Sequence, residues 1–269
     1  MQRSAILGLA LVIAGSVGAS PALADEAAAP SPICTDRPGK ASSTCTVDPG
    51  HFQLEADVVN ATLFRLHGTT TDTWIEINPT LKYGLTDRID IEATFSPLTQ
   101  VRTHGGGVDQ TVSGVSDLFL RVKAKLYSSG PTEISVIPYV KAPTARDGVG
   151  NGAWEGGAVV PLAVKLSDTW SFNYTAEADA LENGANDGHH LNASHTVNLS
   201  YSFPHNVTLS GELWADYNFD PVKTVTQVSA DLGVAWLVTN DFQLDGGVNL
   251  GLSRKTPGAQ VYAGISRKF

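Results

Sequence analysis

The sequence contains no apolar run long enough to cross a membrane as a helix. The apolar stretch 5–17 covers 13 residues and no longer one follows it, whereas a transmembrane helix needs about 20. The class of helical membrane proteins is therefore excluded. Any insertion into a bilayer has to rely on strands, because a closed barrel is the other spanning structure in which every backbone group is paired.

Basic residues are also scarce. The chain has 18 Lys and Arg against 27 Asp and Glu, which gives a net charge of −9 at pH 7. Binding of nucleic acid requires a basic face that contacts phosphates. We therefore expect no nucleic-acid partner, although an acidic balance does not by itself identify a ligand.

Cysteine is nearly absent, since Cys34 and Cys45 are the two that the sequence contains. In an exported protein, two cysteines at this spacing predict one disulfide. Closing such a loop stabilises a fold by roughly 3 kcal/mol. A metal or redox pair is not indicated, because the spacing is not C-x-x-C and no histidine lies between the two residues.

The start of the chain has the pattern of a secretory signal. Arg3 precedes the apolar stretch 5–17, and Ala22-Leu23-Ala24 forms an A-x-A cleavage site. We expect cleavage after Ala24, so that residues 1–24 are removed. Residues 25–50 are rich in Ala, Pro and Ser without strand periodicity, and we interpret them as an N-terminal periplasmic segment that carries the disulfide.

From residue 51 onward, apolar and polar residues alternate with the period of two that is typical of strands. The last stretch is an example, with Val261, Ala263, Ile265 and Phe269 on one parity. The pattern predicts an all-β fold, a transmembrane antiparallel up-and-down barrel over 51–269. It has about twelve strands: 51–64, 72–83, 88–97, 115–127, 133–143, 157–165, 170–180, 191–201, 207–219, 224–237, 242–253 and 259–269.

The connections between these strands alternate in length. Short polar turns separate one set of pairs, and longer Gly-rich stretches such as 98–114, 144–156 and 181–190 separate the other. Outer-membrane barrels have short periplasmic turns and longer external loops. We therefore place both chain ends on the periplasmic side, and we expect loops 98–114 and 144–156 to be candidate gates.

A soluble β-sandwich would also show this alternation, with the apolar parity turned inward. Three features favour the membrane: the export signal, the strand length and the terminal Phe269. A C-terminal strand that ends on an aromatic residue also suggests recognition by the barrel-assembly machinery. Outer-membrane lipid would then contact the apolar parity, and the aromatic residues near the short turns would form an interfacial girdle.

If lipid contacts the apolar parity, the charged parity faces the barrel interior. The first half of the barrel then supplies both bases and acids, and the strands between residues 170 and 253 supply acids alone. Such an interior is either a water-filled pore with a transverse field or a plug of salt bridges. The predicted pore-lining residues are Glu76, Lys82, Arg88, Asp90, Glu92, Asp117, Arg121, Lys123, Lys125, Lys141, Glu177, Asp179, Glu212, Asp216, Asp231 and Asp245.

Other chemistry is weakly indicated. His189, His190 and His195 form the one histidine cluster, which we interpret as loop histidines and not as a metal site. A barrel enzyme of the lipase or acylhydrolase type is one alternative. Ser194 and His195 are adjacent, however, and so point to opposite faces of a strand, and no G-x-S-x-G motif is present. We expect no catalytic residue, cofactor or metal. A structural barrel without transport is the other alternative.

Several stretches of the sequence carry a family resemblance. They are CTDRPGKASSTCTV (34–47), GHFQLE (50–55), NPTLKYGLTDRIDIE (78–92), SDLFLRVKAKL (116–126), IPYVKAPTARDGVGNGAWEGG (137–157), NLSYSF (198–203), ELWADYNFDP (212–221) and QLDGGVNLGLSRKTP (243–257). Together they resemble the bacterial family named Putative MetA-pathway of phenol degradation, along nearly all of the chain after the leader. The resemblance implies an outer-membrane transporter for the passive uptake of small, often aromatic molecules. It carries over no catalytic residues.

Overall fold

A computed structural model describes residues 31–269 of the chain. The predicted signal segment and its cleavage after Ala24 lie outside the described residues. None of the helical segments in the described part is long and apolar enough to span a bilayer.

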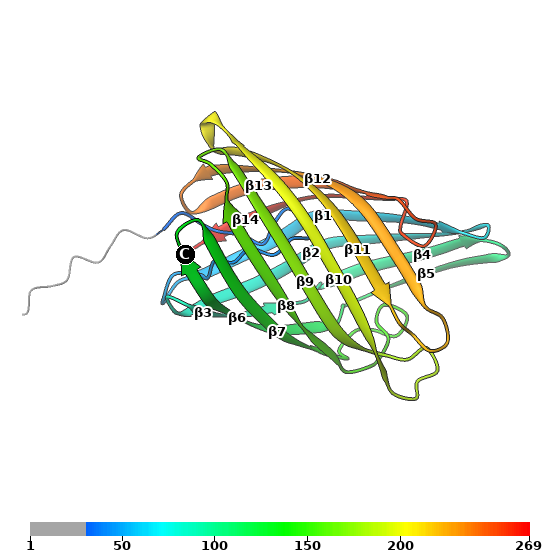
Figure 1. The fold of residues 1–269 in the computed structure, drawn as a ribbon. Helices are drawn as coiled ribbons and strands as arrows, with labels where there is room; N and C mark the ends of the chain where they lie inside the picture. The colour runs from blue at the N-terminus through cyan, green and yellow to red at the C-terminus, as the bar shows by residue number, and fades with distance from the viewer. Residues whose placement is uncertain (1–30) are drawn as a thin grey trace, which may run out of the picture. The chain divides into compact units, whose positions relative to one another are not determined.

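The described residues form one antiparallel sheet with 14 strands (Figure 1). A single turn of 3-10 helix, Pro204–Asn206, interrupts the series. The strands are β1 Phe52–Leu66, β2 Thr69–Thr86, β3 Ile89–Thr94, β4 Leu98–Gly105, β5 Val108–Gly114, β6 Leu118–Ser129, β7 Thr132–Ala142, β8 Glu155–Lys165, β9 Trp170–Glu182, β10 His189–Phe203, β11 Val207–Asn218, β12 Val225–Thr239, β13 Phe242–Gly251 and β14 Ala259–Lys268.

The sheet closes into a barrel because β1 pairs with β14 on one side and with β2 on the other. Every strand except β4 and β5 belongs to the closed ring, so the ring has the twelve strands that the alternation predicts. The predicted all-β barrel is confirmed. Closure leaves no unpaired sheet edge in the ring, which is the condition for a sheet to reside in lipid.

The expectation that 98–114 is a loop is wrong. This stretch forms the β4–β5 hairpin, which pairs with β2 and extends the barrel wall beyond the ring. β-Branched residues at Thr99, Val101 and Thr103 favour strand structure. The tip is Gly105-Gly106-Gly107, all at positive φ, where glycine is favoured. The three consecutive glycines suggested a long flexible loop, but they form the tight turn between β4 and β5.

The two faces of the wall differ in chemistry. Along β12, Leu232 and Val234 are exposed at 55% and 45%, whereas Ser229 and Asp231, which precede them on the other parity, are buried at 1% and 3% exposure. Aliphatic side chains thus cover the outside of the barrel, and charged and hydroxyl side chains turn inward. Outward aromatic residues gather near the short turns, where Phe52 packs on Tyr83 and Trp170 on Tyr201 at 4.6 and 4.9 Å between ring centroids.

Short turns and long connections lie at opposite ends of the barrel. The turns after β2, β6, β8, β10 and β12 lie at the end where the C-terminus emerges (Figure 1). The connections 143–154, 183–188, 219–224 and 252–258 lie at the other end. We call these the terminal end and the loop end of the barrel.

Candidate functional site

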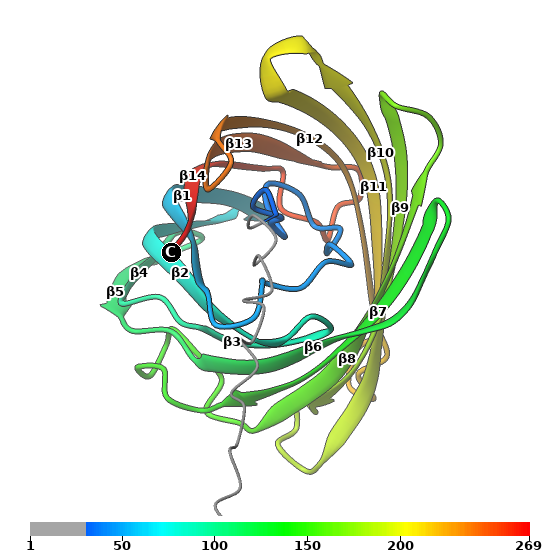
Figure 2. The same ribbon diagram turned by 90° about the vertical axis from the view of Figure 1, so that its left-hand side faces the viewer.

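Residues 31–48, which we call the plug segment, lie inside the barrel (Figure 2). Their side chains and peptide groups bond to residues on β1, β6, β9, β11 and β13, which are distributed around the ring. Only a segment within the lumen can reach all of these strands. For 31–48, the interpretation of 25–50 as a segment that precedes the barrel therefore needs correction.

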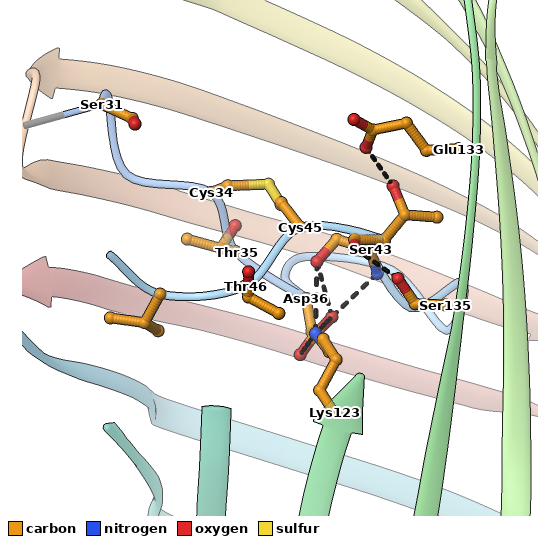
Figure 3. The surroundings of a disulfide bond; sticks show 12 residues. Ser31, Cys34, Thr35, Asp36, Ser43, Cys45, Thr46, Lys123, Glu133 and Ser135 are labelled. Carbon is orange, nitrogen blue, oxygen red and sulfur yellow. Dashed lines mark hydrogen bonds and ion pairs between the residues drawn. A yellow bond between two sulfur atoms is a disulfide. The ribbon is translucent and has the colours of Figure 1, made fainter. Parts of the chain in front are cut away.

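The predicted disulfide is confirmed, because Cys34 and Cys45 are bonded to each other. It closes the loop that contains Asp36, Arg37 and Lys40, and Figure 3 shows Asp36 of this loop against Lys123 of the wall. The Thr44 carbonyl next to the disulfide accepts a bond from the Ser135 hydroxyl at 2.5 Å. The cross-link therefore constrains the loop where it contacts the barrel wall.

Breaking this cross-link should loosen the plug segment without unfolding the barrel. In a chain that carries both Cys34→Ser and Cys45→Ser, the released loop regains entropy worth roughly 3 kcal/mol. We expect faster cleavage of the plug segment by added protease and unchanged thermal unfolding of the barrel. Limited proteolysis in detergent, with reduced wild type as a second sample, measures the first effect. Equal cleavage rates in the double variant and in oxidised wild type would contradict this role of the disulfide.

One charge of the plug segment lies on the basic part of the wall. Asp36 accepts hydrogen bonds from the ammonium groups of Lys123, at 2.7 Å, and of Lys82. Lys82 also pairs with Glu55 at 2.6 Å, and Lys123 is fully buried. Asp36 therefore neutralises two buried cations, which would be costly to bury without a counter-charge.

The ion pairs with Lys82 and Lys123 also shift the pKa of Asp36. Burial alone would raise it, but Lys123 and Lys82 hold the pKa of Asp36 well below its usual value. A carboxyl with a lowered pKa stabilises the folded state above its ordinary pKa of about 3.9, and the contribution is lost as pH falls through the lowered value. We expect the plug segment to stay seated from neutral pH down to about pH 5 and to leave only in stronger acid. Conductance measured against pH checks this, and release near pH 6 would contradict it.

The cations of the plug segment lie on the acidic part of the wall. The Arg37 guanidinium donates to Asp57 at 2.5 Å and to Asp245 at 2.7 Å. The Lys40 ammonium donates to Asp231 at 2.7 Å and to the Ser229 hydroxyl at 2.8 Å. The plug segment is thus complementary to the wall, with Asp36 on the basic side chains and Arg37 and Lys40 on the acidic ones.

Peptide groups of the plug segment bind the wall as well. The amides of Lys40 and Ala41 donate to the Glu212 carboxylate at 2.7 and 3.2 Å, and the Ser42 amide donates to Thr175 at 3.1 Å. A Cβ atom at Gly39 would overlap the Glu212 carboxylate. Glycine therefore lets the backbone approach this carboxylate closely without displacing it.

Fourteen of the sixteen residues predicted to line the pore face the interior or are at least half-buried there, as follows. Lys82, Asp90, Glu92, Asp117, Lys123, Lys141, Asp179, Glu212, Asp231 and Asp245 are buried, and Arg121, Lys125, Glu177 and Asp216 are partly buried.

One predicted position differs, and a second is not described. Arg88 lies in the turn between β2 and β3 and is exposed, so it does not join the interior charges. The side chain of Glu76 is outside what the structure describes. Sequence reasoning missed Asp36, Arg37 and Lys40, and also the inward Glu55 and Asp57 of β1.

Three acidic side chains on the loop-end side of the plug segment have no ion pair in the described part of the chain. Glu177 accepts from Ser194 at 3.3 Å, Asp179 from the Tyr139 hydroxyl at 2.7 Å, and Asp216 from Asn192 at 2.8 Å. We call Glu177, Asp179 and Asp216 the outer carboxylates. The predicted acidic wall is thus only partly compensated by the plug segment.

The plug segment leaves open space around itself. Cavities of about 290 and 350 Å³ border residues 36–43, and a smaller one of about 180 Å³ lies beside Lys40. The interior is therefore neither an open pore nor a solid block of salt bridges. Polar cavities surround a segment that is held by side-chain contacts.

At the loop end, the connection 143–154 folds onto the inner wall. Lys141 pairs with Glu155 at 2.7 Å and with Asp117 at 3.3 Å. It also donates at 2.5 Å to the Asn151 amide oxygen of the connection. This arrangement positions 144–156, one of the two predicted gates, beside the opening.

The histidine cluster does not converge. His189 bonds to the Trp154 carbonyl and His190 to Asn183, at 2.8 and 3.1 Å, whereas the ring of His195 stacks on Tyr217 at 5.8 Å between centroids. No metal-binding group of three or more ligands occurs in residues 31–269. Ser194 bonds inward to Glu177, so Ser194 and His195 lie on opposite faces of β10 as predicted.

Comparisons with known proteins agree with this geometry. The profile of the family described as "Putative MetA-pathway of phenol degradation" matches residues 35–269. The COG4313 outer membrane channel from Pseudomonas putida F1 is similar in fold, with a TM-score of 0.68 at 16% identity, over 87% of this chain and 99% of that one. No curated protein sequence matches the chain.

Two further solved structures share the fold more distantly. The beta domain of the Bordetella autotransporter BrkA has a TM-score of 0.52 at 13% identity, over 82% of this chain and all of that one. The KdgM porin in complex with disordered oligogalacturonate has a TM-score of 0.50 at 8% identity, over 78% and 98%.

Proposed function

Because the chain belongs to the family described as Putative MetA-pathway of phenol degradation, we propose that it is a channel of the bacterial outer membrane for the passive uptake of small molecules, aromatic compounds among them. The observation that carries the proposal is a closed barrel with an aliphatic exterior and a polar interior that contains cavities. A wall of this kind separates lipid from a water-accessible path.

The plug segment makes this a regulated path. Solutes would pass through the cavities beside residues 36–43 or after the segment shifts, because side-chain contacts and no strand pairing hold it in the lumen. The connection 144–156 is the proposed gate at the loop end, where Lys141 holds it against the wall.

Reconstitution tests the proposal directly. The purified chain, placed in planar bilayers and in liposomes, should give discrete conductance steps and should admit small solutes from a panel of phenols, benzoates and sugars. Deletion of residues 103–111 should leave conductance unchanged, because the β4–β5 hairpin stands outside the ring. Absence of conductance and of flux, also with the plug segment removed, would reject the channel and favour a structural barrel.

An enzyme remains the alternative class that is simplest to test. Ser194 and His195 cannot act as nucleophile and base from opposite faces of one strand. We propose that the chain is not an enzyme, and esterase activity in detergent would contradict this.

We further propose that the barrel-assembly machinery recognises the strand that ends in Phe269. The backbone of Phe269 exchanges two hydrogen bonds with the backbone of Phe52, at 2.8 and 3.2 Å, where β1 and β14 close the barrel. Deleting Phe269 should lower the amount of folded barrel in outer membranes, and an unchanged amount would contradict the proposal.

A further inference from the structure

We propose that the interior site filled by Lys40 binds small organic ammonium ions, and that Lys40 is a tethered competitor for that site. The inference rests on the proposed channel function and names a solute class for it. We call the side chains of Trp214, Ser229 and Asp231 the ammonium site.

The contacts of Lys40 are those by which proteins recognise a free ammonium ion. Its nitrogen lies 2.7 Å from a carboxylate oxygen of Asp231, 2.8 Å from the Ser229 hydroxyl and 4.8 Å from the centroid of the Trp214 ring. The carboxylate gives a charge-assisted hydrogen bond, and the indole face attracts a cation through its quadrupole. Charge, hydrogen bonding and an aromatic face thus converge on one point.

The ammonium site is built by the barrel and not by the plug segment. Ser229 and Asp231 share the inner face of β12, and Trp214 lies opposite Ser229 on β11. Ser229 also donates to Asp231 at 3.1 Å, which fixes the carboxylate. Because these side chains stand on paired strands of the ring, the site persists when Lys40 leaves it.

Asp231 retains an acceptor that Lys40 does not use. Its Oδ1 atom is buried and has no hydrogen-bond partner in the described part of the chain, whereas Oδ2 receives both Lys40 and Ser229. A buried carboxylate oxygen is rarely left unpaired in proteins. A free ammonium ion can orient its three donors more fully than a lysine that is fixed by its own backbone, and so could bond to both oxygens.

The path from the loop end favours cations. The outer carboxylates lie on β9 and β11, nearer the loop end than the ammonium site, and carry no ion pair in residues 31–269. Arg121, on β6, borders the same cavity as Glu177, and it forms no ion pair with any of the three outer carboxylates in the described residues. A lumen lined by one excess sign of charge concentrates solutes of the opposite sign.

Lys40 competes with such solutes because it is tethered. A group on a short flexible tether acts at an effective concentration of about millimolar. The plug segment has further anchors at Asp36 and Arg37, so replacing Lys40 should empty the site while the segment stays in place. A cavity of about 180 Å³ borders Lys40, so the space that the Lys40 side chain vacates would adjoin it.

The test uses the full chain in detergent, with benzylammonium as the probe and benzyl alcohol as its neutral counterpart. Calorimetric titration compares wild type, K40M and the double variant K40M/D231N, with K165M as the matched control. Lys165 lies in an exposed ion pair with Asp168 at the terminal end. We expect K40M to bind benzylammonium about tenfold more tightly than wild type, since it removes a competing charge-assisted bond. K165M should equal wild type, and K40M/D231N should lose the gain.

Three outcomes overturn the inference: K40M binds the probe no more tightly than K165M, K40M binds benzyl alcohol equally well, or the gain persists in K40M/D231N. If D231N fails to fold, S229A in the K40M background replaces it, and it should lower affinity severalfold. Bilayer recordings separate this inference from the channel proposal. Conductance without binding of the probe rejects the ammonium site alone, and binding without conductance in any variant rejects the channel alone.

Discussion

Replacing Asp36 with Asn should raise the open probability of the channel by about two orders of magnitude. The change removes the nearer of the two carboxylates that bridge Lys82 and Lys123, and it leaves Glu92 at 3.7 and 3.5 Å from them. Removing one partner of a buried ion pair costs 3–5 kcal/mol. The Asp36 side chain is 24% exposed, so we take the lower end of this range, about 3 kcal/mol. That free energy corresponds to roughly a hundredfold change in the ratio of seated to released plug segment.

Single-channel recording measures this effect, and Asp168→Asn is its matched control. Asp168 pairs with Lys165 in an exposed turn at the terminal end, so the control removes the same charge outside the lumen. The control should behave as wild type. If D36N and D168N give the same traces, the plug segment does not limit conduction.

The second large effect concerns the outer face. Replacing Leu232 with Arg should destabilise the folded barrel by about 2–4 kcal/mol, because a cation near the bilayer midplane is costly on the lipid face of a barrel. Leu232 is at the middle of β12 and is exposed on the outside. Urea unfolding from lipid vesicles, followed by intrinsic tryptophan fluorescence, gives the difference.

Leu166→Arg is the control for this variant. Leu166 is equally exposed, at 58%, but it lies in the turn after β8 at the terminal end. Near the interface the same substitution costs about 0–1 kcal/mol. Equal effects at both positions would show that depth in a membrane does not matter, and the barrel would then be a soluble one.

The sequence allowed the ring to be predicted because a strand in a barrel wall alternates between two solvents. In β12 the step from Asp231 to Leu232 is a step from the interior to lipid, and this period of two is local information. The β4–β5 hairpin was missed because Gly105-Gly106-Gly107 indicates a flexible loop, although three glycines at positive φ also form a tight tip.

The plug segment could not be located from its own residues. A segment without periodicity carries no signal of what surrounds it, and Asp36, Arg37 and Lys40 are ordinary loop residues by composition. An indirect signal existed in the predicted wall, where Glu212, Asp231 and the other inward acids of the strands between residues 170 and 253 had no inward base among them. Buried charges require partners, and the cations near the N-terminus were available to supply them.

The claim on which everything else depends is that one parity of each strand contacts acyl chains while the other contacts the lumen. Single cysteines at positions 231–236 of β12, spin-labelled in lipid vesicles, test it directly, because Cys34 and Cys45 are bonded to each other and leave no second free thiol. We predict that labels at 232, 234 and 236 collide with oxygen dissolved in the bilayer, and that labels at 231, 233 and 235 do not. Oxygen access at the odd positions, with access of a water-soluble nickel reagent at the even ones, would contradict the account.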